Sequence, residues 1–124
     1  EGALPGREIT LGQNNILMPG SVVEAGCELG DNNTVWSNVT VCHDTRLGNH
    51  NFLAAGTVIG GRSIVGSACF FGFSSVVLQE TEVADETLLG ALSMLDKPSK
   101  SAGQYLGVPA RLVASHAAQG IEID

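Results

Sequence analysis

The sequence is poor in charged, aromatic and basic residues. Charged residues make up 15% of its 124 residues and aromatic residues 5%. Its six Lys and Arg residues are scattered and outnumbered by 13 Asp and Glu residues, which gives a formal net charge of −7. Because nucleic-acid binding requires clustered basic side chains, this charge balance argues against a nucleic-acid partner.

Long hydrophobic runs and a cysteine framework are also missing. No stretch has the length of a membrane-spanning helix, and the first residues lack the pattern of a signal peptide, so we expect no membrane partner. The three cysteines, Cys27, Cys42 and Cys69, have neither CxxC spacing nor an even count. Reduced thiols in the cytoplasm fit this usage better than a disulfide scaffold or a zinc site.

What the sequence does contain is a large apolar residue at every sixth position over most of its length. The residue after this apolar anchor is often one of the 16 glycines, and the fourth residue after it is mostly small. A period of six matches neither an α-helix nor a plain strand, so the chain must turn within each unit. The anchors are Leu11, Leu17, Val23, Leu29, Val35, Val41, Leu47, Leu53, Ile59, Val65, Phe71, Val77, Val83, Leu89 and Leu95.

The repeat predicts an all-β solenoid made of one domain. Each unit supplies a short strand with its anchor pointing inward, followed by a tight corner that favours glycine or a small residue. Three units close a triangular coil, and Gly12, Gly30, Gly48 and Gly66 recur at this three-unit spacing. Residues 11–100 would then form about five parallel coils, with strands about 4.8 Å apart. A right-handed solenoid with longer, less regular coils is the alternative.

The two ends of the chain depart from the repeat. Residues 1–10 are expected to form an arm or a partial coil, and residues 101–124 a loop, an extended segment and a helix. The polar stretch 96–104 is typical of a loop, and 105–113 of an extended segment. Residues 110–119 have a helix-forming composition, and a short C-terminal helix there would cover the open edge of the last coil.

A His-Asp pair lies at one of the expected corners. Counting one full coil in either direction places His43 between Ala25 and Gly61, so its imidazole should point outward beside almost bare backbone. Gly61 allows close approach to the main chain and exposes an N–H donor. The same count places Arg62 next to Asp44, where it could compete for the carboxylate or help to bind a substrate.

The pattern [LIV]-G-x-x-[STC]-x resembles the hexapeptide-repeat acyltransferases, whose fold is a left-handed parallel β-helix. The stretch CHDTRLGNHNFLAAGTVIGG (42–61), residues 68–97 and YLGVPARLV (105–113) look like one subgroup of that family. The subgroup comprises the sialic-acid O-acetyltransferases and the nucleotide-linked amino-sugar N-acetyltransferases of bacterial glycan synthesis. The handedness comes from this resemblance, because parallel crossovers are ordinarily right-handed.

The resemblance implies an acetyltransferase that uses acetyl-CoA and acts on an amino or hydroxyl group of a sugar or sugar nucleotide. His43 would be the general base, Asp44 would orient its ring, and the Gly61 N–H would bind the oxyanion. The resemblance also implies a homotrimer with active sites between subunits, a small-molecule acceptor and no metal. It leaves open which acceptor is used and whether nitrogen or oxygen is acylated.

The resemblance further assigns a set of residues to acetyl-CoA. Phe52 fills the position at which the family often has a second histidine that contacts this donor. The segment Gly107 to Arg111 corresponds to a closing motif in the acetyl-CoA region of the family. The candidates for the acetyl-pantetheine path are Gly72, Phe73, Gly90, Ala91, Gly107 and Pro109, and those for phosphate contacts are Lys97, Lys100 and Arg111.

Two other functions are weighed against this one. A non-catalytic scaffold or assembly protein is the main alternative, because nothing in the chain corresponds to the N-terminal substrate-binding domain that the family usually carries. A zinc carbonic anhydrase would need three converging histidines. The only histidines are His43, His50 and His116, and their spacing does not suit that class. His50 and His116 are interpreted as surface residues.

Overall fold

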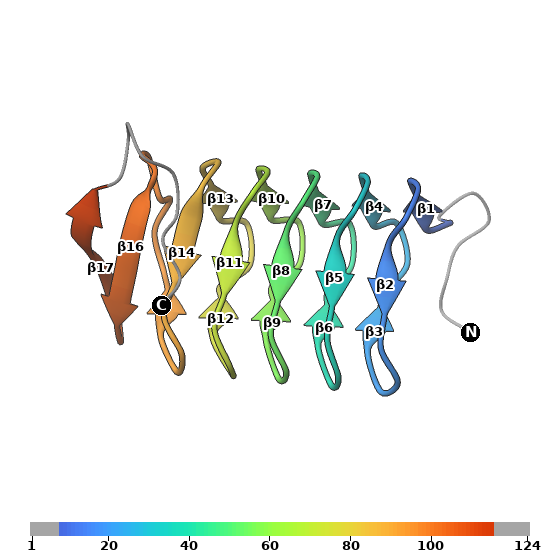
Figure 1. The fold of residues 1–124 in the computed structure, drawn as a ribbon, viewed down its shortest axis with the longest axis horizontal. Coiled ribbons are helices and arrows are strands. Elements are labelled where there is room, and N and C mark those ends of the chain that lie inside the picture. The colour runs from blue at the N-terminus through green and yellow to red at the C-terminus, as the bar shows by residue number, and fades with distance from the viewer. Residues whose placement is uncertain (1–7, 116–124) are drawn as a thin grey trace.

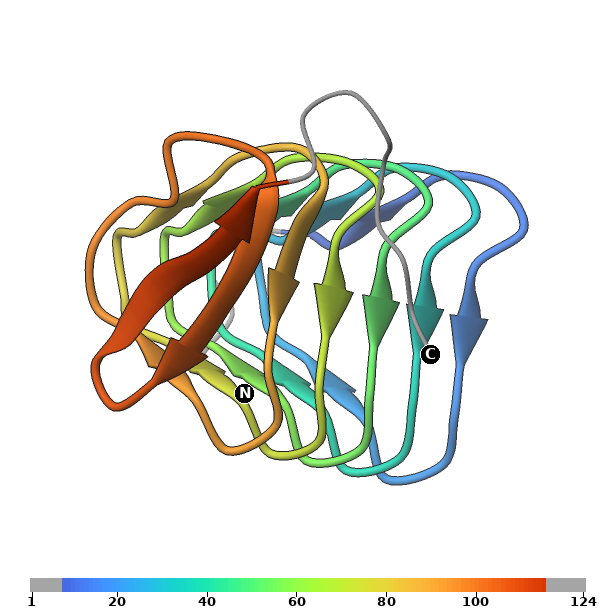
Figure 2. The same cartoon turned by 60° about the vertical axis from the view of Figure 1, so that its left-hand side comes forward.

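The computed structural model describes residues 8–115, which form a three-sided parallel β-solenoid (Figures 1 and 2). Its coils number about five, as the repeat predicts. In Figure 1 the chain advances from right to left while the strands of the near face point downward, which is the left-handed sense. The coil strands are β1 (Thr10–Leu11), β2 (Ile16–Leu17), β3 (Val22–Val23), β4 (Glu28–Leu29), β5 (Thr34–Val35), β6 (Thr40–Val41), β7 (Arg46–Leu47), β8 (Phe52–Leu53), β9 (Val58–Ile59), β10 (Ile64–Val65), β11 (Phe70–Phe71), β12 (Val76–Val77), β13 (Glu82–Val83), β14 (Thr87–Leu89) and β15 (Met94–Leu95).

Three sheets form the sides of the prism. Sheet 1 has the order β1-β4-β7-β10-β13, sheet 3 has the order β15-β12-β9-β6-β3, and sheet 2 contains β14, β11, β8, β5 and β2 together with two later strands. Each coil strand pairs in parallel with the equivalent strand of the next coil, as Leu29 with Leu47 and Phe52 with Phe70. We call the corner from sheet 1 to sheet 2 the first corner, that from sheet 2 to sheet 3 the second, and that from sheet 3 to sheet 1 the third.

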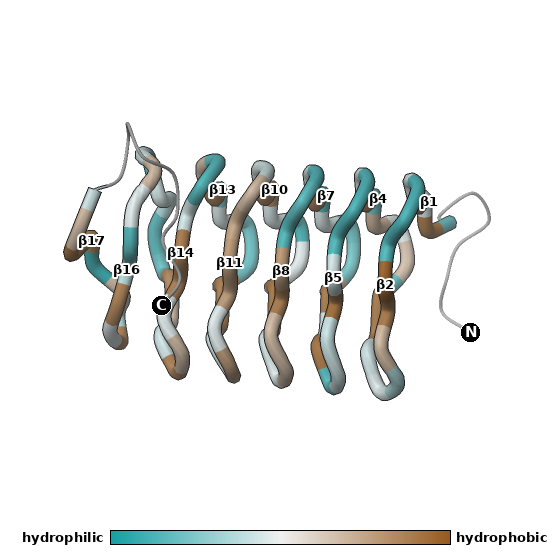
Figure 3. Tube along the Cα trace, viewed as in Figure 1, coloured by the Kyte–Doolittle hydropathy of each residue, from teal (hydrophilic) through white to brown (hydrophobic). Residues whose placement is uncertain are grey.

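The anchors fill the interior. Those from Leu29 to Leu95 are almost completely buried, and Cys27 and Cys69 occupy small inward positions among them. In the first coil Leu11 and Leu17 are 47% and 41% exposed, because they lie at the N-terminal end of the described solenoid. Figure 3 shows hydrophobic strands in successive coils, with hydrophilic residues along the first corner at the top and more hydrophobic ones along the second corner at the bottom.

The first corner carries a ladder of buried amides. The side chain of Asn51 accepts the N–H of Cys69 at 2.8 Å and donates to the carbonyl of Gly66 at 3.0 Å. Asn33 repeats this arrangement one coil earlier, accepting the Asn51 N–H and donating to the Gly48 carbonyl. These bonds give the Asn51 and Cys69 N–H groups an acceptor inside the corner and give the Gly48 and Gly66 carbonyls a second donor.

The C-terminal part of the solenoid differs from the expectation. Residues 110–115 are not helical but form β17 (Ala110–Ser115), antiparallel to β16 (Gly103–Gly107), and no helix occurs within residues 8–115. The strand β16 in turn pairs in parallel with β14, so the hairpin continues sheet 2. The open edge of β14 offers backbone donors and acceptors that a strand satisfies and a helix does not. His116 and the rest of the expected helix lie outside the described residues.

Candidate active site

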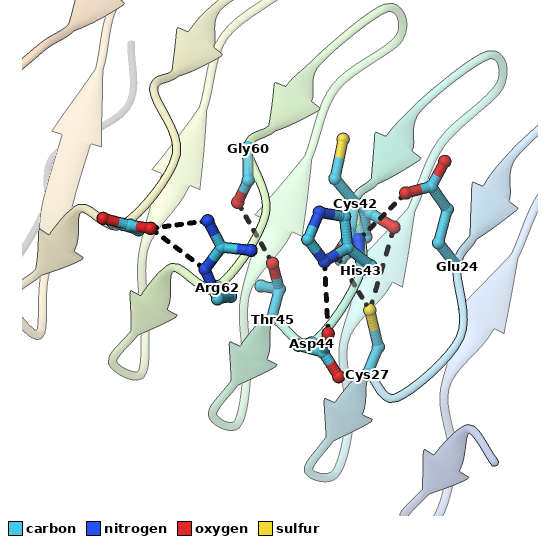
Figure 4. A network of polar contacts seen from close by, with 10 residues as sticks. Glu24, Cys27, Cys42, His43, Asp44, Thr45, Gly60 and Arg62 are labelled. Carbon is cyan, nitrogen blue, oxygen red and sulfur yellow. Dashed lines mark hydrogen bonds and ion pairs between the residues drawn. The ribbon is translucent and has the colours of Figure 1, made fainter. Parts of the chain in front are cut away.

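His43 and Asp44 lie at the third corner, between β6 and β7 (Figure 4). His43 Nδ1 is 3.1 Å from Asp44 Oδ2, and the side chains are 45% and 38% exposed. Asp44 adopts a φ of 58°, a left-handed conformation that Asp tolerates better than most residues, and its N–H donates to the Ala25 carbonyl at 3.1 Å. The corner therefore presents an oriented imidazole to solvent, as the repeat count predicts.

Gly61 lies directly under the imidazole, in the next coil. A Cβ atom at this position would be 2.6 Å from His43 Nε2, and the three nearest atoms that it would meet all belong to the ring. Only glycine therefore allows the ring to lie across the backbone here. The Gly61 carbonyl accepts the N–H of Glu80 at 2.8 Å, whereas the Gly61 N–H donates no hydrogen bond to another of residues 8–115.

Arg62 does not compete for the Asp44 carboxylate. Its Nε donates to Glu80 Oε2 at 3.0 Å, and its Nη2 contacts the same oxygen. Glu80 lies one coil further on, in register with Arg62, so the two exposed side chains meet along the third corner. The guanidinium is thus turned away from the His43–Asp44 pair.

The structure adds Glu24, which sequence reasoning missed. Its Oε1 accepts the backbone N–H of His43 at 2.9 Å, reaching across from the preceding coil (Figure 4). The coil count could have suggested this contact, because it places Glu24 one coil before Cys42, the residue that precedes His43. Below the pair, Cys27 Sγ donates to the Cys42 carbonyl at 3.0 Å.

The environment of the three cysteines raises the pKa of each thiol. Burial raises the pKa of the Cys27 and Cys42 thiols, and the Glu24 carboxylate adds to the effect at Cys42. Burial also raises the pKa of Cys69 to about 11. All three thiols are free, and their protonated form is favoured at neutral pH.

Most candidates for the acetyl-pantetheine path lie at a different corner. Gly72, Phe73, Gly90 and Ala91 belong to the second corner, and the hairpin turn with Gly107 and Pro109 lies beside it, because Gly107 donates its N–H to Ser93. Phe73 is 62% exposed. Leu106 occupies the space over Gly90 that a side chain would need. Within one chain, these acetyl-pantetheine candidates and His43 therefore lie at different corners of the solenoid.

Phe52 points outward from the face of sheet 2 and joins a stack of aromatic rings. Its ring centroid is 5.1 Å from that of Phe70, with the planes within 5° of each other. On the other side the Trp36 centroid lies at 6.1 Å. Trp36 is 40% exposed, so the stack is open to solvent at this end.

The basic candidates surround two separate cavities at the C-terminal end. Lys97 and Arg111 line one of about 210 Å³, where Arg111 Nη1 is 3.5 Å from Asp96 Oδ1. Lys100 lines another of about 520 Å³, together with the carboxylates of Glu82 and Asp85. Of the three basic residues, only Lys97 and Arg111 could therefore contact the same ligand group within one chain.

Two further properties concern residues 8–115 as a whole. No three His, Cys, Asp or Glu side chains in this range approach closely enough to hold a metal ion. No helix in the same range is long and apolar enough to cross a membrane.

The sequence matches a known family and longer curated proteins. The family described as bacterial transferase hexapeptide (six repeats) matches residues 8–43. Over 111 residues the chain is 28% identical to the acyl-[acyl-carrier-protein]–UDP-N-acetylglucosamine O-acyltransferase of Rhizobium johnstonii, a match that covers 84% of this chain and 41% of that protein. The chain spans less than half of the length of the curated relatives that it matches.

Solved structures share the fold, and two of them illustrate the likeness. The acetyltransferase domain of PglB from Neisseria gonorrhoeae superposes with a TM-score of 0.75 at 23% identity, over 86% of this chain and 55% of that one. A hexapeptide-repeat acetyltransferase from Vibrio cholerae, complexed with acetyl-CoA, superposes with a TM-score of 0.78 at 15% identity, over 86% of this chain and 70% of that one. At these identities the likeness shows the fold alone. The sixfold repeat, the family match over residues 8–43 and the acyltransferase relatives all show a likeness to hexapeptide-repeat acyltransferases.

Proposed function

We propose that the protein transfers an acetyl group from acetyl-CoA to an amino or hydroxyl group of a sugar or sugar nucleotide. The observation that carries the proposal is the third corner, where the His43 ring is held by Asp44 and lies across Gly61. The acyltransferase relatives support the reaction class, and the name of the Rhizobium johnstonii relative supports a nucleotide-linked sugar as the acceptor.

The geometry of the pair suits a general base. An ionised Asp44 carboxylate has no proton to donate, so the His43 nitrogen that faces it must carry the proton. This selects the tautomer with a proton on Nδ1 and leaves the Nε2 lone pair free to take a proton from the acceptor substrate. His43 Nε2 would remove the proton as the acceptor nitrogen or oxygen attacks the thioester carbonyl. The Gly61 N–H would bind the oxyanion, and collapse of the intermediate would release CoA, whose sulfur takes up the proton from the imidazolium.

The site would be completed by a second copy of the chain. His43 lies at the third corner, whereas Phe73 and the hairpin turn lie at the second, so acetyl-CoA would bind in the groove between two subunits of a homotrimer. Such packing places the same two corners together at each of three equivalent interfaces. The solved neighbour with bound acetyl-CoA supports this donor.

The subgroup and the compartment are part of the proposal. The segments that resemble the sialic-acid O-acetyltransferases and amino-sugar N-acetyltransferases include His43, Asp44 and the hairpin turn around Pro109. We place the reaction in the cytoplasm, where reducing conditions suit three free cysteines.

The test is CoA release with candidate amino-sugar nucleotides and sialic acids as acceptors. His43→Ala should lower kcat by about 100- to 10,000-fold, because general-base catalysis contributes about this factor. His50→Ala is the matched control, since His50 lies at another corner, and it should behave as wild type. Full activity of His43→Ala would remove the imidazole from the mechanism.

A parallel binding experiment separates the alternatives. Calorimetry with acetyl-CoA should show binding, whereas a pure scaffold would show none. A second experiment repeats the transfer assay with acetyl groups carried on acyl carrier protein, because the name of the Rhizobium johnstonii relative specifies an acyl carrier protein donor. Turnover with the carrier protein but not with acetyl-CoA would overturn the donor assignment while leaving acyl transfer intact.

A further inference from the structure

Glu24 reaches the backbone of His43 from the preceding coil. Its half-buried carboxylate accepts the His43 N–H at 2.9 Å, next to the Cys42 thiol (Figure 4). We infer that Glu24 is a positioning residue, which fixes the peptide from which the His43 imidazole projects. The inference rests on the proposed function, because it assigns Glu24 a role through the proposed base.

The glycine in the next coil changes which residue can accept the His43 N–H. At the first corner the equivalent N–H groups are bonded by side chains one coil further on: the Asp31 N–H donates to Asn49 Oδ1 at 2.7 Å, and the Ser67 N–H donates to Asp85 Oδ1 at 2.8 Å. At the third corner the residue one coil beyond His43 is Gly61, which has no side chain to accept the bond. The Glu24 carboxylate supplies the acceptor from the opposite side.

Glu24 and Asp44 therefore fix two different parts of the same residue. Asp44 bonds the ring at Nδ1, whereas Glu24 bonds the main chain and so sets the direction of the Cα–Cβ bond. A bond from N–H to a carboxylate is charge-assisted and stronger than one between neutral groups. Gly61 has no side chain to clash with the imidazole, but it also has none to accept the His43 N–H. Glu24 accepts this N–H from the preceding coil and so leaves the backbone of Gly61 uncovered.

The experiment compares three variants of the full chain in the CoA-release assay. Glu24→Ala removes the acceptor, and kcat should fall about 10- to 100-fold with little change in the KM for acetyl-CoA, because displacement of a catalytic group by about 1 Å costs about this factor. Glu24→Gln keeps an Oε1 acceptor and should retain kcat within about threefold. Glu28→Ala, which removes an exposed carboxylate near Arg46, is the control and should match wild type.

Three outcomes would overturn the inference: wild-type kcat in Glu24→Ala, equal losses in Glu24→Ala and Glu24→Gln, or an equal loss in Glu28→Ala. A second readout does not depend on turnover. The backbone amide proton of His43 should move upfield in the NMR spectrum of Glu24→Ala and hold its position in Glu24→Gln. If wild type transfers no acetyl group, the proposed function fails, and an unmoved amide signal in Glu24→Ala would overturn the contact separately.

Discussion

At the scale of single residues, the site depends on what surrounds one imidazole. The coil count alone predicted that His43 would project outward beside Gly61, because a coil of constant length puts them in register. The same count placed Arg62 beside Asp44 but could not show that Arg62 prefers Glu80. It also missed Glu24, because a long side chain reaches a backbone group outside its own column.

The residue-scale prediction concerns Gly61. Gly61→Ala should displace the imidazole, because the added Cβ would lie 2.6 Å from His43 Nε2, and kcat for CoA release should fall about 100-fold. The alanine retains the N–H, so the loss would report the position of the ring. In a His43→Ala background the same change should leave Tm unaltered, since the clash is gone. A wild-type kcat in Gly61→Ala would contradict the close approach of the His43 imidazole to the Gly61 backbone.

At the scale of elements, the coils follow the sequence closely and the C-terminal hairpin does not. Six-residue periodicity determines both where each strand lies and which side chain points inward, so strands and core were predictable from Leu29 to Leu95. The composition of 110–119 favours a helix, but β16 pairs with the open edge of β14, and residues 110–115 then pair with β16 as β17. Local composition is a weak determinant where a sheet edge is available.

The element-scale prediction concerns the amide ladder of the first corner. Asn51→Ala would leave the buried Cys69 N–H without its acceptor and the Gly66 carbonyl with the Gly48 N–H as its remaining donor, which should lower the free energy of unfolding by about 2 to 3 kcal/mol. Asn49→Ala, at an exposed position of the same corner, should cost about 1 kcal/mol or less. Urea unfolding followed by circular dichroism measures both. Equal costs would contradict a stabilising role for the buried ladder.

At the scale of the whole molecule, the three-sided prism separates the two halves of the proposed site. The imidazole lies on the third corner, and the exposed Phe73 lies with the hairpin turn at the second. The sequence could predict each half, because both belong to the repeat or to the closing motif. The coil count also assigns His43 and Phe73 to different corners, but it could not place the hairpin turn beside Phe73, because the residues after Leu95 lie outside the repeat.

The most direct measurement is a crystal structure of the protein with CoA bound. We predict a trimer in which the CoA sulfur lies in the groove between two subunits, within about 4 Å of His43 Nε2, near enough for proton transfer after slight movement. The same structure should show the pantetheine chain against Phe73 and the Gly107–Pro109 turn of the adjacent subunit. CoA bound far from every His43 ring would contradict acetyl transfer at the third corner.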